Sequence, residues 1–262
     1  MKRRRRVMAF LPASLRALLS NLIDYAGLYP PAALPLREVS ERYQTYRESP
    51  HGWMLNRLVL PAAQLMDLPL GDGWRISLLV DDEPGPLPPE VETLETKLTR
   101  PLSRPTYCEA PLHQVTGAFL KVRTGGITPD AIPSPETIAD FLHLAAARRL
   151  PFKATAGLHH PIRSRRPLTY ATDSPRAVMH GFVNVFAAAA FAWYGHERDL
   201  LLEVLTAESA SAFEFAGNDL RFRGRGLSTV QLQAARDEFA HSFGSCSFEE
   251  PVADLRELGL LP

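Results

Sequence analysis

Two lysines stand in similar sequence frames and are the residues of this chain best suited to covalent chemistry. Lys121 lies in FLKVRTGG and Lys153 in PFKATAGLHH, and each frame is typical of a strand that ends at glycine. An amine that is crowded by a second cation, or held in an apolar pocket, loses its proton more easily than a solvated amine. Such a lysine can act as a nucleophile near neutral pH, so the pair indicates amine chemistry.

The segment between the two lysines predicts how they are placed. It reads PSPETIADFLHLAAARRLP, and its capping serine, its proline in the first turn and its amphipathic run favour a helix. A strand, a helix and a second strand of this length form a crossover between parallel neighbours. We therefore expect Lys121 and Lys153 to lie side by side at the carboxyl-terminal edge of a sheet.

The two lysine frames also resemble those of a known enzyme family. K-x-x-T-G followed by K-A-[ST]-x-G-[IL] on consecutive strands is similar to the class I aldolases of the deoxyribose-phosphate aldolase type, and the similarity covers residues 119–163. The resemblance implies that Lys121 forms a Schiff base with a carbonyl substrate. It also implies that Lys153 is the partner that tunes the reactivity of Lys121.

The remaining sequence predicts a barrel. Eight strand-like runs occur in series, and helical patterns are most evident after the first, sixth, seventh and eighth. The runs are 22–31, 56–65, 75–82, 91–98, 105–112, 117–126, 151–160 and 181–186. This order favours an α/β protein, a (β/α)8 TIM-like barrel with some outer helices shortened or missing. An open α/β sheet is the alternative.

We expect residues 1–262 to form one barrel domain. Residues 1–22 would be a basic segment followed by a helix, and residues 207–262 a C-terminal extension over the barrel. In that extension AFEFAGNDLRFRG predicts a hairpin with a Gly-Asn-Asp turn, followed by helices. HSFGSCSFEEP is interpreted as a loop that ends a helix at Gly244, or as a lid that carries Cys246.

Alternation of side chains along the strands predicts which charged groups share a face. Thr93, Glu95 and Lys97 form one such set, and Tyr107 with Glu109 another. If these faces point inward, the charges must pair, as Glu95 with Lys97 or Glu109 with Lys121.

The candidate catalytic residues are Lys121, Lys153, Glu95 and Glu109, of which a glutamate would move a proton. The candidate substrate-binding residues are Arg123, Thr155, His159, Lys97, Asp24 and Asn184. Purely structural ion pairs are the competing interpretation.

Two of these candidates are polar residues in otherwise apolar runs, where a buried polar group must find partners. Asp24 in LIDYAGLYPP either balances the lysines or caps a neighbouring loop. Asn184 in GFVNVF either contacts the substrate or is a hydrogen-bonded amide of the core.

His159 is interpreted as a general base or as a residue that forms a hydrogen bond to a loop. A metal site would have to combine it with Glu95, Glu109 or His180, and the spacing matches no common metal motif, so we predict no metal. The chain has no G-x-G-x-x-G, phosphate loop or G-x-S-x-G. We therefore predict no nucleotide cofactor, and no cofactor of another kind.

The composition of the chain limits the kinds of partner and the cellular environment that we expect for it. Lys plus Arg equals Asp plus Glu at 29 each, so the body of the protein gives no reason to expect a nucleic-acid partner, and no run is long and apolar enough to span a membrane. The basic opening MKRRRRV is interpreted as a solvated terminus rather than a nucleic-acid or membrane tether. The two cysteines, Cys108 and Cys246, fit a reducing cytoplasm. The sequence does not define the oligomeric state.

The sequence thus favours a barrel enzyme that is aldolase-like or lyase-like and uses a Schiff-base lysine on a small carbonyl or carboxylated substrate. One alternative is a barrel isomerase or metal-assisted enzyme in which His159 and Glu109 transfer protons. A second alternative is a barrel that binds a ligand or partner without catalysis.

Overall fold

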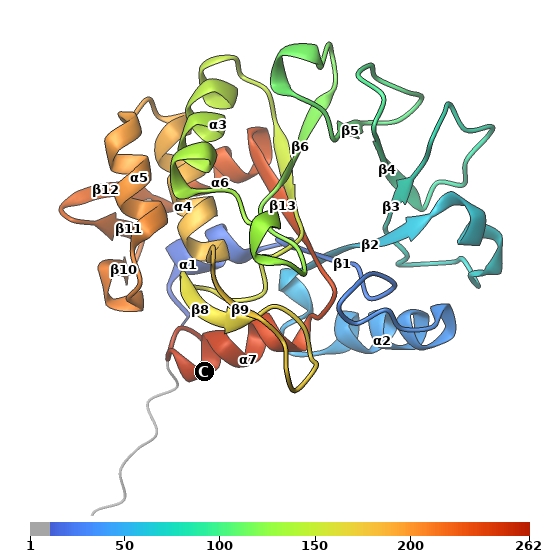
Figure 1. Cartoon of the computed structure of the whole chain (residues 1–262), viewed down its shortest axis with the longest axis horizontal. Helices are drawn as coiled ribbons and strands as arrows, with labels where there is room; N and C mark the ends of the chain where they lie inside the picture. The colour runs from blue at the N-terminus through green and yellow to red at the C-terminus, as the bar shows by residue number, and fades with distance from the viewer. Residues whose placement is uncertain (1–10) are drawn as a thin grey trace, which may run out of the picture.

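A closed barrel of eight parallel strands forms the centre of the protein (Figure 1). The computed structural model describes residues 11–262, and the basic segment MKRRRR lies outside them. Around the barrel the strands follow the order β1-β13-β7-β6-β5-β4-β3-β2, and β1 closes the ring by pairing with both β2 and β13. The strands are β1 (Ile23–Tyr25), β2 (Leu55–Pro61), β3 (Ile76–Leu79), β4 (Val91–Thr96), β5 (Thr106–Cys108), β6 (Phe119–Arg123), β7 (Phe152–Thr155) and β13 (Ala240–Ser245). The predicted (β/α)8 TIM-like fold is confirmed.

The helices around the barrel are distributed unevenly, as Figure 1 shows. Within the described residues, the links that follow β2, β3, β4 and β5 contain no α-helix, and of these links only those after β2 and β5 contain a 3-10 turn. The helices are α1 (Ala13–Leu19), α2 (Leu36–Glu48), α3 (Pro135–Ala147), α4 (Phe182–Trp193), α5 (Arg198–Thr206), α6 (Thr229–Glu238) and α7 (Glu249–Glu257). The short links include the proline-rich segments DDEPGPLPPE and TRPLSRP, in which proline disfavours helix continuation. Among residues 11–262, no helix has the length and apolar character needed to cross a membrane.

The predicted eighth strand is wrong. GFVNVF begins α4, and the eighth strand of the barrel is β13, in a segment that we expected to be the end of a helix and the loop or lid after it. Aromatic and β-branched residues made GFVNVF resemble a strand, but they suit a helix that is buried along its whole length. Phe182 and Phe186 of this helix pack against Phe243 of β13, with ring centroids 5.2 and 6.0 Å apart.

The C-terminal region is therefore part of the barrel rather than an extension over it. Residues 207–262 contain β13 and α6, which belong to the wall and its outer layer, and Gly244 lies inside β13 instead of ending a helix. The predicted hairpin is present as β10 (Phe213–Ala216) and β11 (Asp219–Phe222), and β12 (Arg225–Ser228) adds a third strand. A further hairpin that we did not predict, β8 (Ser164–Pro167) with β9 (Arg176–Met179), follows β7.

The glycines that end the two lysine frames allow β6 and β7 to approach each other closely. A Cβ atom added at Gly157 would lie 2.7 Å from the Cα atom of Gly125, and Gly157 has a φ of +77°. Beside this contact Thr124 Oγ1 donates a hydrogen bond to the Ala156 carbonyl at 2.6 Å. Glycine is required here because a side chain would separate the two strand ends.

Candidate functional site

A cavity of about 760 Å³ lies at the carboxyl-terminal ends of the barrel strands, where barrel enzymes place their active sites. All four candidate catalytic residues line it, namely Lys121, Lys153, Glu95 and Glu109. Four of the six candidate substrate-binding residues line it as well, namely Arg123, Thr155, His159 and Lys97. The barrel thus brings together residues that lie on, or just after, the four consecutive strands β4 to β7.

Lys121 and Lys153 are direct register partners on β6 and β7, as their frames predicted. A carboxylate bridges them. Glu95 of β4 places Oε1 at 2.5 Å from Lys153 Nζ and Oε2 at 3.0 Å from Lys121 Nζ. The two lysines therefore share an anion, and the two cations that we expected to crowd each other alternate with carboxylates instead.

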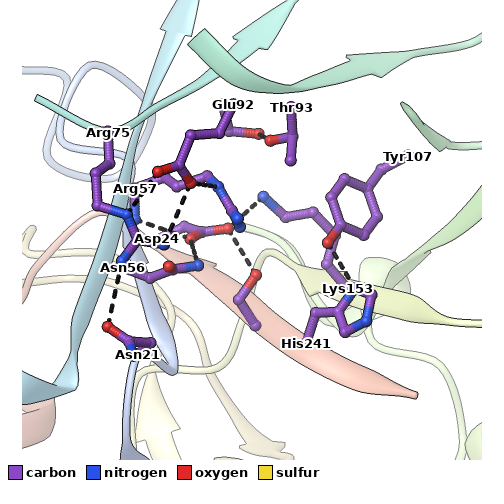
Figure 2. Close-up of polar contacts among 12 residues, drawn as sticks. Asn21, Asp24, Asn56, Arg57, Arg75, Glu92, Thr93, Tyr107, Lys153 and His241 are labelled. Atoms are coloured by element: carbon purple, nitrogen blue, oxygen red, sulfur yellow. Dashed lines mark hydrogen bonds and ion pairs between the residues drawn. The ribbon is translucent and has the colours of Figure 1, made fainter. Parts of the chain in front are cut away.

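Lys153 is the deeper of the two lysines and is held as an ammonium ion. Its side chain is 1% exposed, and Nζ also lies 2.6 Å from Asp24 Oδ2 (Figure 2). Burial acts to lower the pKa of Lys153, but the charges of Asp24 and Glu95 and their hydrogen bonds raise it above its ordinary value. This amine is therefore suited to fixing charge in the site, and poorly suited to nucleophilic attack.

Asp24 balances the lysine, which was one of the two roles considered for it. It is fully buried and accepts hydrogen bonds from Asn56 Nδ2 and Ser242 Oγ, each at 2.7 Å. Burial acts to raise the pKa of Asp24, but the charges of Lys153 and Arg57 lower it. Asp24 is not among the residues that line the cavity. It therefore contacts Lys153 from the side of the lysine that faces away from the cavity.

Lys121 is the amine nearer to the cavity. Its side chain is 9% exposed, and its second carboxylate partner is Glu109, with Nζ 3.0 Å from Oε2. The predicted pairing of Glu109 with Lys121 is thereby found. Glu109 also accepts a hydrogen bond from the exposed Arg123 at 3.1 Å, so the row of charges runs from the barrel interior to the rim.

Glu95 is held as a carboxylate. Ser77 Oγ donates a hydrogen bond to its Oε1 at 2.6 Å, and Thr93 Oγ1 donates to Ser77 in turn. Burial acts to raise the pKa of Glu95, but Lys153 and Lys121 lower it to about 2. The predicted pair of Glu95 with Lys97 is wrong, because Lys97 is exposed at the cavity rim and Glu95 contacts the two interior lysines instead.

Below Lys153 the barrel interior continues as a polar network, which Figure 2 displays. Tyr107 Oη lies 2.7 Å from His241 Nδ1, and Glu92 accepts hydrogen bonds from Arg57 and Arg75 at 2.7 and 2.8 Å. These contacts pair the polar groups at the amino-terminal ends of the strands. The opposite end of the barrel interior, where Lys121 and Lys153 lie, opens into the cavity.

A second cluster surrounds His159 at the same cavity. His159 Nδ1 lies 3.1 Å from Glu250 Oε2 and 4.0 Å from Cys246 Sγ, and Tyr170 Oη lies 3.7 Å from the same sulfur. Burial acts to lower the pKa of His159, but Cys246 and Glu250 raise it to about 9. Sequence reasoning did not link these residues, because they come from the segments that follow β7 and β13, from α7 and from the turn of the β8–β9 hairpin, and share no local spacing.

Tyr29 is a further cavity residue that the sequence did not reveal. It lies in the link between β1 and α2, and its hydroxyl oxygen is buried with no hydrogen-bond partner among the described residues. Burial and the charge of Glu95 raise the pKa of Tyr29 to about 12, so the hydroxyl keeps its proton at neutral pH. A bound molecule can use this hydroxyl as a hydrogen-bond donor.

Asn184 lies outside the cavity, which corrects its place among the substrate-binding candidates. It is buried in α4, and its Nδ2 donates hydrogen bonds to the carbonyls of Val204 and Ala207 at 2.7 and 2.8 Å. Its Oδ1 accepts from the Arg163 backbone amide at 2.9 Å. Of the two roles considered for Asn184, the structure therefore supports that of a hydrogen-bonded amide in the core.

His180, one of the residues with which His159 would have to combine in a metal site, has a hydrogen-bonding partner elsewhere. His180 Nε2 lies 2.8 Å from the Pro133 carbonyl oxygen. Across residues 11–262, no group of three or more His, Cys, Asp or Glu side chains is arranged to hold a metal ion.

Comparisons with protein families, with curated proteins and with solved structures find no match to this chain. The class of the protein is accordingly set by its architecture, a TIM-like (β/α)8 barrel with a charged cavity at its carboxyl-terminal end.

Proposed function

We propose that this protein is an aldolase-like or lyase-like enzyme that binds a carbonyl compound covalently through Lys121. The observation that carries the proposal is the arrangement of the two amines. Lys121 faces the cavity between Glu95 and Glu109, while the buried Lys153 supplies a fixed positive charge behind Glu95. The resemblance of the two lysine frames to the class I aldolases of the deoxyribose-phosphate aldolase type supports the same assignment.

The chemistry begins when the Lys121 ammonium gives a proton to Glu109, whose Oε2 lies 3.0 Å away. The free amine attacks the carbonyl carbon, and a C–N bond forms as the C=O π bond breaks and a proton passes from the attacking nitrogen to the carbonyl oxygen. A second proton, returned from Glu109, allows that oxygen to leave as water. Ammonium and carbonyl are thus converted to iminium and water, with no net change of charge.

The iminium then withdraws electrons from the neighbouring carbon, where a C–C bond can be broken or formed. Glu95 and Glu109, which is again a carboxylate once it has returned its proton, flank the nitrogen and stabilise the positive charge of the iminium. Lys153 keeps Glu95 ionised and in place, because its ammonium holds the other carboxylate oxygen. The substrate in this proposal is a small-molecule carbonyl compound, and no cofactor takes part in these steps.

Borohydride trapping tests the proposal. The protein is incubated with small aldehydes and ketones, reduced, digested and analysed by mass spectrometry, and we expect an adduct on the peptide that contains Lys121. Lys121→Ala should remove the adduct, whereas Lys97→Ala should retain it because Lys97 lies at the rim and contacts neither glutamate. The proposal fails if the wild-type protein gives no adduct, or if Lys121→Ala gives as much as the wild type.

A second candidate function is proton transfer without a covalent intermediate, as in an isomerase. It is favoured by the contact between His159 and Glu250, because a carboxylate on Nδ1 orients the ring and leaves Nε2 for exchange with a bound molecule. Glu109 lines the same cavity and would serve as the partner base. This function predicts exchange of α-hydrogens of a carbonyl compound with deuterated water in Lys121→Ala, and loss of the exchange in His159→Gln.

A further inference from the structure

The cavity wall consists of two arcs with different chemistry. Strands β4 to β7 and the residues that follow them contribute the charged groups Glu95, Lys97, Glu109, Lys121, Arg123 and Lys153. Strands β1 to β3 and the residues that follow them contribute mainly apolar groups, among them Ala26, Val59, Pro61, Leu79 and Val80. Because each set of strands is contiguous in the closed barrel, a charged arc and an apolar arc share one cavity.

The orientation of Leu79 shows how the apolar arc is built. Leu79 and Ser77 lie two residues apart on β3 and therefore on the same face, and Ser77 contacts Glu95 inside the barrel. Leu79 consequently points into the cavity, one step nearer its mouth. Asp81, which follows on the same side, is exposed at the rim, so it does not place a buried charge within the arc.

Apolar groups also extend to the mouth of the cavity. Leu168 and Met179 reach it from the β8–β9 hairpin, and Ile127 reaches it from the link between β6 and α3. Ile127 is 46% exposed although it is a large aliphatic residue. Apolar side chains therefore line the entrance of the cavity as well as the β1–β3 arc, and both can contact an apolar ligand.

Size and polarity together restrict the ligand. A cavity of about 760 Å³ lies in the range that holds a drug-sized molecule, and it is larger than a two-carbon or three-carbon carbonyl compound needs. A small hydrophilic substrate would leave the apolar arc facing water. The Tyr29 hydroxyl is buried in this wall without a partner among the described residues, and it can donate a hydrogen bond to a polar atom of the bound molecule.

We infer that the substrate is an amphiphilic carbonyl compound, whose carbonyl group meets Lys121 and whose alkyl or aryl body lies along the β1–β3 arc. Tyr29 donates a hydrogen bond to an oxygen of the bound molecule. The carbonyl half of this inference rests on the proposed Schiff-base function, whereas the apolar half rests on the cavity wall alone.

A homologous series of straight-chain aldehydes, from acetaldehyde to hexanal, tests the inference. Each is trapped with cyanoborohydride, and the concentration that gives half-maximal labelling of Lys121 is measured by mass spectrometry. That concentration should fall roughly fourfold for each added methylene, which is the effect of burying one such group. Leu79→Asn should flatten this dependence, and Val230→Asn should not, because Val230 is 77% exposed on α6 and is not a lining residue.

A parallel series of primary alcohols, from ethanol to hexanol, separates the two halves of the inference, since alcohols cannot form an iminium. Their affinities are measured by ligand-observed NMR. If Lys121 is labelled by acetaldehyde but neither series gains affinity with chain length, the amphiphilic substrate is ruled out and the Schiff-base function stands. If no aldehyde labels Lys121 while the alcohols bind more tightly as they lengthen, the Schiff-base function is ruled out and the apolar arc is supported.

Discussion

Glu95 of β4 contacts Lys153 of β7 at 2.5 Å across the interior of the barrel, although β5 and β6 separate these strands along the wall. Both side chains are almost fully buried. A buried ion pair of this kind contributes little net stability relative to an apolar pair of similar volume. Removal of one partner, however, leaves an uncompensated charge in the interior.

Glu95→Gln is therefore expected to destabilise the protein by roughly 3–5 kcal/mol, because it removes the carboxylate that both lysines share. The free energy of unfolding is measured by urea denaturation near neutral pH. Glu109→Gln is the matched control, since Glu109 is partly exposed and its loss should cost roughly 1 kcal/mol or less. Equal, small effects of the two substitutions would contradict the burial and bridging role of Glu95.

Stability should also fall in acid because of the same carboxylate. The pKa of Glu95 is lowered from 4.5 to about 2 in the folded protein, where burial is outweighed by the two lysines. Its contribution to stability is therefore complete above about pH 4.5 and is lost as the pH falls towards 2, and it is on the order of 3 kcal/mol. Denaturation at a series of pH values should show a smaller acid-dependent loss in Glu95→Gln than in the wild type.

The sequence predicted the strand–helix–strand unit around the lysines because the signals for it are local. Alternation, a capping serine and terminal glycines all fall within residues 119–163, and the register of Lys121 with Lys153 follows from them. The same reasoning located seven strands of the barrel. It misplaced the eighth because β13 consists mainly of small and polar residues and directly follows a helix, whereas GFVNVF has the composition of a strand.

The partners of the site residues could not be predicted in the same way. Glu95 was expected to pair with Lys97, two positions along its own strand, but barrel closure brings it to lysines on β6 and β7. The contacts of His159 with Cys246 and Glu250 likewise depend on how the ends of distant elements meet. Local sequence patterns identify residues that face a cavity, but closure of the barrel decides which of them touch.

Gly157→Ala should test the close approach of β6 and β7. The substitution adds a Cβ atom 2.7 Å from the Cα atom of Gly125, at a backbone φ of +77°. We expect a loss of roughly 2–4 kcal/mol of unfolding free energy, from the disfavoured φ together with the steric overlap. Gly195→Ala is the control, because Gly195 has the same φ, but among residues 11–262 none beyond its chain neighbours has an atom within 4 Å of the added carbon. Its loss of unfolding free energy should be roughly 1–2 kcal/mol. Equal losses of unfolding free energy in the two variants would show that the ends of β6 and β7 can move apart without a cost in stability.

Cys246 should react with iodoacetamide at least about tenfold faster than Cys108. Burial acts to raise the pKa of the Cys246 thiol, but His159 and Tyr170 lower it, and Cys246 lines the cavity. The pKa of Cys108 is raised by burial, and Cys108 is fully buried. Alkylation is followed by peptide mass spectrometry at neutral pH. His159→Gln should slow labelling of Cys246 and leave Cys108 unchanged; equal rates in the two proteins would argue against the His159–Cys246 contact.

Asn184→Ala should lower stability without changing the lysine chemistry. The substitution leaves the carbonyls of Val204 and Ala207 and the amide of Arg163 without their side-chain partner in the core, at an expected cost of roughly 2–4 kcal/mol in urea denaturation. Because Asn184 lies in α4 and outside the cavity, the yield of the reduced adduct at Lys121 should match that of the wild type when both proteins are folded. A reduced yield at an equal folded fraction would place Asn184 in contact with the substrate, against the position of α4 behind β13.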